Sequence, residues 1–71
     1  MTSDELAFGI KSLLEFVQDD EDVREDHGLP DEFETARIRT FDEVGMLTRD
    51  AGLVVKLSDG RTFQVTVIQS R

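Results

Sequence analysis

Residues 53–68 read LVVKLSDGRTFQVTVI, two apolar runs on either side of the turn signal Ser58-Asp59-Gly60. This pattern predicts a β-hairpin. A two-residue Asp-Gly turn would place Val55 opposite Gln64, and in that register every apolar side chain faces a polar one. A three-residue turn instead brings apolar side chains together, in the pairs Val55–Phe63, Leu53–Val65 and Ala51–Val67. Because the buried face sets the register of a strand, we predict a type I turn followed by Gly60 in the left-handed conformation, with a G1 bulge.

The same register gives the hairpin an outer face, made of Val54, Lys56, Thr62, Gln64, Thr66 and Ile68. Upstream, residues 35–41 read TARIRTF, in which Ala36 and Ile38 alternate with Arg37 and Arg39. This period-2 pattern predicts another half-buried strand, with its arginines, and Phe41 beyond them, pointing outward. The following Gly45 marks either a turn or a bulge, and in the second case the residues VGML around it continue the strand.

Residues 4–18 predict an amphipathic helix, because apolar residues recur at helical spacing in the stripe Leu6, Ile10, Leu13 and Val17. Thr2 and Glu5 fit a capping box at its start. We expect the stripe to face the sheet, and Gly9 beside it to permit a close approach of helix to sheet. Phe8 falls on the polar face of the helix, where it is either a lone exposed apolar residue or a contact for a partner.

These elements predict a single α+β domain over residues 1–71, in which an N-terminal amphipathic helix packs on a three-stranded antiparallel β-meander (αβββ) within residues 35–70. An acidic connection, DDEDVREDHGLPDEFE, occupies residues 19–34. The helix either ends near Asp19 or continues to about Asp26 and stops at Gly28. Pro30 is placed to open a single helical turn before Phe33.

Charge is divided unevenly along the chain. The 71 residues carry 16 acidic and 8 basic side chains, a formal net charge of −8. Residues 1–34 contain all but four of the acids and only two of the bases, Lys11 and Arg24. The acidic balance argues against direct binding to nucleic acid or to a membrane surface, both of which are anionic. Without a signal peptide or an apolar run long enough to span a bilayer, the chain is expected in the cytoplasm.

The residue types that most catalytic and metal sites need are scarce. The chain has no cysteine and one histidine, His27, and its five glycines are scattered rather than gathered in a phosphate-binding loop. An EF-hand register starting at Asp20 puts Arg24 at a ligand position and Glu25 where the turn requires glycine. We therefore expect no enzymatic activity, no catalytic residues, no cofactor and no specific metal site.

The composition favours binding through charge. We expect a protein-interaction module whose acidic helix and loop bind a basic partner surface, in the manner of a nucleic-acid mimic that inhibits nucleic-acid-binding machinery. Apolar anchors and acids together give the expected contact set: Phe8, Glu15, Asp19, Asp20, Glu21, Asp22, Glu25, Asp26 and Phe33.

The alternative function is a homo-oligomeric assembly domain. The last strand, RTFQVTVIQS, has no acid, proline or lysine to prevent edge pairing, so a homodimer could form there. The residues expected to support self-association are Arg37, Arg39, Val54, Gln64, Thr66 and Ile68. Direct nucleic-acid binding is the least favoured hypothesis, and it would use Arg37, Arg39, Lys56, Arg61 and Arg71.

Overall fold

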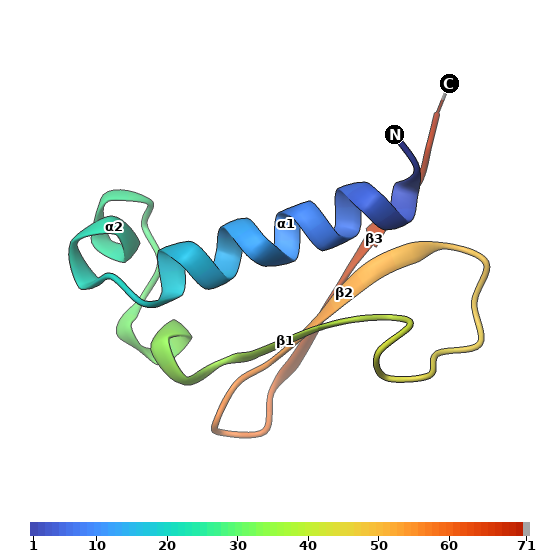
Figure 1. Cartoon of the computed structure of the whole chain (residues 1–71). Helices are drawn as coiled ribbons and strands as arrows, with labels where there is room; N and C mark the ends of the chain where they lie inside the picture. Colours follow the sequence, from blue (N-terminus) through green and yellow to red (C-terminus); the bar gives the residue numbers. More distant parts are fainter. Residues whose placement is uncertain (71) are drawn as a thin grey trace.

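The computed structural model describes residues 1–70, in two layers (Figure 1). Helix α1 (Ser3–Gln18) lies across one face of an antiparallel sheet of strands β1 (Arg37–Thr40), β2 (Ala51–Lys56) and β3 (Thr62–Val67), in the order β1-β2-β3. The predicted αβββ arrangement is therefore confirmed. Between α1 and β1 the chain forms a second helix, α2 (Glu21–Asp26), and a 3-10 turn, η1 (Asp31–Thr35). Neither helix in residues 1–70 has the length and apolar character needed to cross a membrane.

The hairpin has the register predicted from its apolar pairs. Val55 lies opposite Phe63, Leu53 opposite Val65, and Ala51 opposite Val67. The three-residue turn closes with the Leu57 amide donating to the Arg61 carbonyl at 2.8 Å, and Gly60 has a φ of 95°. A side chain at Gly60 would be strained, which explains the glycine. Between β1 and β2, residues 41–45 form a turn, so the VGML sequence does not continue the strand.

Helix α1 is rotated about its axis relative to the expected orientation. The capping box is present, with the Glu5 amide donating to Thr2 Oγ1. However, Ala7 is the buried residue of the helix, and Ile10 and Leu14 pack beside it, whereas Leu13 is 67% exposed. The expectation that the whole stripe faces the sheet is therefore wrong for Leu6 and Leu13, which are both exposed.

Polar contacts to the β1 side explain the rotation. Gln18 Nε2 donates to the carbonyl oxygens of Phe33, at 2.9 Å, and of Ala36, at 2.5 Å. Two helical turns earlier on the same face, Lys11 Nζ lies 3.0 Å from Glu43 Oε1, in the turn that follows β1. These contacts hold one flank of α1 over β1, and the apolar flank consequently turns toward β3. There Leu6 and Val67 line a common hollow.

This rotation leaves part of the inner face of the sheet uncovered. On β1 and β2, the inward residues Ile38, Leu53 and Val55 are buried beneath α1. On β3, the inward residues Phe63 and Val65 are 52% and 43% exposed. We call this surface the open side; it consists of the exposed Phe63 and Val65 of β3 and Leu6 and Leu13 of α1, with the half-buried Val67 at its border.

The close approach expected at Gly9 occurs instead at Gly52. A Cβ on Gly9 would meet nothing within 4 Å, so no neighbour requires a glycine there. A Cβ on Gly52 would clash with the Val65 carbonyl oxygen and would lie 2.5 Å from ring carbons of Phe41. Phe41 points to the outer face, as predicted, but it folds over Gly52 and is buried.

Candidate functional site

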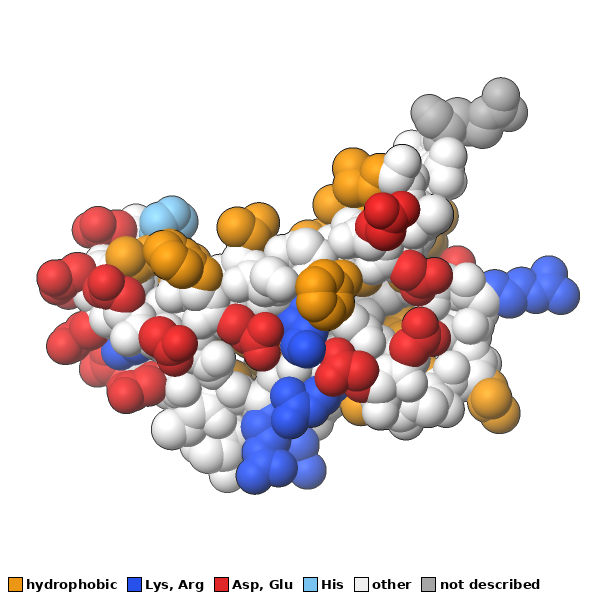
Figure 2. Space-filling view, in the orientation of Figure 1, with side chains coloured by type: hydrophobic (Ala, Val, Ile, Leu, Met, Phe, Trp, Pro, Cys, Tyr) orange, Lys and Arg blue, Asp and Glu red, His pale blue; other side chains and the backbone are white. Residues whose placement is uncertain are grey.

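The acidic residues between Glu15 and Glu34 gather at one end of the molecule, around α2 (Figure 2). We call this group the acidic end; it consists of Glu15, Asp19, Asp20, Glu21, Asp22, Glu25, Asp26, Asp31, Glu32 and Glu34. All of them are exposed except Glu15, which is half-buried. The first helix ends at Gln18, close to the first predicted boundary, and a separate helix, α2, extends to Asp26. The helical turn predicted after Pro30 is present as η1.

Local signals explain why α2 forms in so acidic a sequence. Asp20 caps its start, and its Oδ1 accepts hydrogen bonds from the amides of Asp22 and Val23. Acids in the first turn also suit the positive end of the helix dipole. Gly28, with a φ of 74°, reverses the chain after the helix, and Pro30 precedes η1. Asp20 therefore has a structural role that its place in the predicted contact set did not anticipate.

The single base of this region, Arg24, points inward. It is only 4% exposed; its Nη1 donates to the Gln18 carbonyl oxygen, and its Nη2 lies 3.6 Å from Glu34 Oε2. Its Nε has no hydrogen-bond partner among residues 1–70. Because the cation is buried against the end of α1, no positive side chain within α2 interrupts the carboxylates at the surface.

Some of the ten carboxylates are engaged within the chain. Besides Asp20 and Glu34, Glu32 Oε2 lies 2.6 Å from Arg61 Nη2. Within residues 1–70, no side-chain hydrogen bond or ion pair engages the remaining exposed members, Asp19, Glu21, Asp22, Glu25, Asp26 and Asp31. These six are the carboxylates that a partner could contact without breaking a contact of the fold.

The two apolar residues of the expected contact set, Phe8 and Phe33, lie in different environments. Phe33 is 8% exposed and packs with Ile38 and Leu57 in the core, so it is not available at the surface. Phe8 is exposed, and the Lys11 ammonium lies 5.7 Å from its ring centroid. Phe16, which was not among the expected contact residues, is 72% exposed one helical turn before Asp19. Its position on the flank of the predicted stripe was the available signal.

The outer face of the sheet carries the second charged group. Arg37 and Lys56 lie directly opposite each other on β1 and β2, and Arg39 follows on the same face. None of the three pairs with a carboxylate in residues 1–70. Of the other predicted self-association residues, Val54, Gln64 and Thr66 share this face by register. Ile68 follows the last paired residue of β3 and lines a hollow with Leu6 and Val67 at the start of α1. Arg61 pairs with Glu32 and Asp59, and Arg71 lies outside the described residues.

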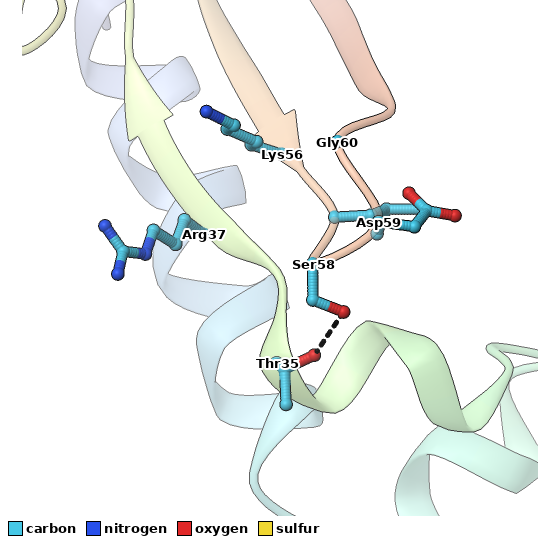
Figure 3. Close-up of a pocket in the computed structure, with 7 residues that line it drawn as sticks. Thr35, Arg37, Lys56, Ser58, Asp59 and Gly60 are labelled. Atoms are coloured by element: carbon cyan, nitrogen blue, oxygen red, sulfur yellow. Dashed lines mark hydrogen bonds between the residues drawn. The ribbon is translucent and has the colours of Figure 1, made fainter.

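A hollow of about 650 Å³ adjoins these bases at the hairpin turn (Figure 3). Arg37 and Lys56 extend from neighbouring strands to one side, and Thr35 Oγ1 donates to Ser58 Oγ at 3.3 Å. The hollow is open and contains no histidine or cysteine among its lining residues. Besides the two bases, its lining includes one acid, Asp59, whose carboxylate pairs with Arg61.

His27 and the carboxylates do not assemble into a coordinating group. His27 is exposed, with its Nδ1 2.8 Å from the Val23 carbonyl oxygen. Over residues 1–70, no three His, Cys, Asp or Glu side chains are placed to hold a metal ion together. No protein-family model, curated protein or solved structure matches the chain. A function must therefore be inferred from the surfaces of the molecule itself.

Proposed function

We propose that the protein is a non-enzymatic interaction module whose acidic end binds a basic surface on a partner protein. The observation that carries this proposal is the inward orientation of Arg24, which leaves carboxylates as the only charged groups on the surface of α2. Such a surface attracts a basic partner from a distance, and the attraction weakens as salt screens it. Electrostatic complementarity of this kind mainly increases the association rate and orients the partner.

The partner class that fits is a protein with a basic groove for nucleic acid. A cluster of exposed carboxylates resembles a phosphate backbone in the sign of its charge, so it can occupy such a groove and exclude nucleic acid from it. Phe16, beside Asp19, supplies an exposed aromatic side chain for apolar contact. Buried aromatic residues often account for much of the affinity at protein interfaces. We therefore infer an inhibitory role for the acidic end.

The experiment compares two variants that each remove three negative charges. Asp22→Asn/Glu25→Gln/Asp26→Asn changes the acidic end at positions whose side chains form no hydrogen bond or ion pair within residues 1–70. Asp4→Asn/Asp42→Asn/Asp50→Asn removes the same charge elsewhere, at exposed positions without side-chain partners in residues 1–70. Each immobilised 71-residue chain is used to capture proteins from its source cells at low and at high salt.

The wild type and the second variant should retain a basic protein that heparin or double-stranded DNA displaces, and the first variant should lose it. Phe16→Ala should weaken retention mainly by faster dissociation. If both triple variants retain the same proteins, the acidic end only confers solubility and the proposal is wrong. A second candidate function, a homo-oligomeric assembly domain, is favoured by a separate observation at the edge of β3.

A further inference from the structure

The two free edges of the sheet differ in how their main-chain groups are satisfied. In an antiparallel ladder, alternate residues direct their N–H and C=O groups toward each neighbouring strand. The Phe41 amide donates to the Gly52 carbonyl, so in β1 the odd-numbered residues bond to β2 and the even-numbered ones face outward.

Side chains occupy this outward edge of β1. Gln18 Nε2 donates to the Ala36 carbonyl at 2.5 Å, and Arg39 Nη1 donates to the Ile38 carbonyl at 3.0 Å. The Thr40 amide donates to Glu43 Oε1 at 3.2 Å. An incoming strand would have to displace all three contacts, so the edge of β1 is closed to pairing.

The edge of β3 has no such protection. Because the Leu57 amide bonds to the Arg61 carbonyl, the odd-numbered residues of β3 bond to β2. Thr62, Gln64 and Thr66 therefore direct their main-chain groups to the free edge. Within residues 1–70, no side chain or loop satisfies those groups. The strand also lacks the charged residues and prolines that usually block edge pairing.

We propose that a second copy of this chain pairs with β3, antiparallel, about a two-fold axis at Val65. This register aligns the strand with itself over its whole length. On the inner face, Val65 meets Val65 of the second copy and Phe63 meets Val67, so every pair is apolar. On the outer face, Gln64 meets Thr66, and this outward-directed pair exchanges main-chain hydrogen bonds in both directions. Thr62 meets Ile68, one residue beyond the end of β3.

The proposed axis also explains the open side. A two-fold axis perpendicular to the sheet places both α1 helices on the same face, antiparallel, with their apolar flanks turned toward the joined β3 strands. Phe63 and Val65, half-exposed in one chain, then lie in the middle of a six-stranded sheet between Leu6 and Leu13 of the two helices. The acidic ends lie at opposite corners, because α2 packs on the far end of α1 (Figure 1). The like charges of the two copies are thus kept apart.

One test uses main-chain chemistry at the edge. Gln64→Pro removes an amide that faces the free edge and leaves the bonds to β2 in place, a position where edge strands tolerate proline. Gln64→Thr is the matched control, because it keeps the amide. In sedimentation equilibrium from about 1 μM to about 1 mM, a span that covers common dissociation constants, the wild type and Gln64→Thr should reach twice the 8.0 kDa chain mass. Gln64→Pro, checked for native circular dichroism, should stay monomeric.

A second test fixes the register through a disulfide, since the chain has no native cysteine. Val65→Cys places two cysteines across a pair with Cα atoms about 4.5 Å apart, which suits a disulfide. Thr62→Cys is the control, because the same register separates its two copies by about 20 Å. Mild oxidation should cross-link the first variant and not the second. A wild type that stays monomeric throughout, a dimer that survives Gln64→Pro, or equal cross-linking of both cysteine variants would overturn the proposal.

Discussion

The inner face of β2 and the inner face of β3 have the same alternating pattern and opposite environments. Leu53 and Val55 on β2 are buried beneath α1, whereas their cross-strand partners Val65 and Phe63 on β3 are about half exposed. Alternation in a strand determines which face a side chain takes. Whether that face is covered depends on where the next layer lies, and here polar contacts from Gln18 and Lys11 draw the helix toward β1.

Truncation of one cross-strand pair should separate the two environments most clearly. Leu53 is fully buried, so Leu53→Ala should lower the free energy of unfolding by about 2–5 kcal/mol. Val65→Ala, opposite it, removes a side chain that is 43% exposed and should cost less than about 1 kcal/mol in dilute solution. Urea unfolding monitored by circular dichroism measures both.

Protein concentration is the control for this pair. If two copies join at β3, the cost of Val65→Ala grows as concentration rises, because dimer formation then contributes to stability. The loss of stability in Leu53→Ala should depend less on concentration, because Leu53 is buried within a single chain and lies outside the proposed dimer contact. Equal costs for the two variants in dilute solution would mean that Val65 is covered within a single chain.

The two glycines outside the turns, Gly9 on α1 and Gly52 on β2, also differ in their surroundings. Gly52→Ala forces a methyl group against Phe41 and the Val65 carbonyl, and overpacking of this kind costs about 1–3 kcal/mol. Gly9→Ala adds a methyl group in open space on a helix, where it should stabilise by up to about 1 kcal/mol. Thermal unfolding of the two variants should therefore shift in opposite directions. A destabilised Gly9→Ala would show that this face of α1 approaches another surface.

Local sequence patterns predicted α1, the three strands and the hairpin register, but neither α2 as a separate helix nor the rotation of α1. The register followed because only one turn length pairs Leu53 and Val55 with apolar residues. The rotation depends on contacts such as Gln18 with Ala36 and Lys11 with Glu43, between residues far apart in sequence. A helical stripe reports which side chains avoid water, and it does not identify the surface that covers them.

The acidic end was predictable as a set of charges and not as a surface. The count of acidic residues in the sequence located the acidic end. The helix α2 depends on the cap at Asp20, and the absence of a positive charge on its surface depends on the burial of Arg24. An arginine among acids is normally expected at the surface. The position of Phe33 was also predicted wrongly. Its charged sequence neighbours suggested an exposed side chain, but Phe33 packs beside Ile38 in the core.

The smallest expected effect concerns Glu43, whose carboxylate accepts from the outward Thr40 amide at the closed edge. The hydrogen bond from Lys11 is the main cause that lowers the pKa of Glu43. A lowered pKa stabilises the fold above the ordinary glutamate value of about 4.3, and this contribution is lost as pH falls through the lowered pKa. Glu43→Gln should therefore flatten the acid side of the stability–pH curve, whereas Asp42→Asn beside it should change the curve less. Identical stability–pH curves for the two variants would mean that the ion pair between Lys11 and Glu43 does not stabilise the fold.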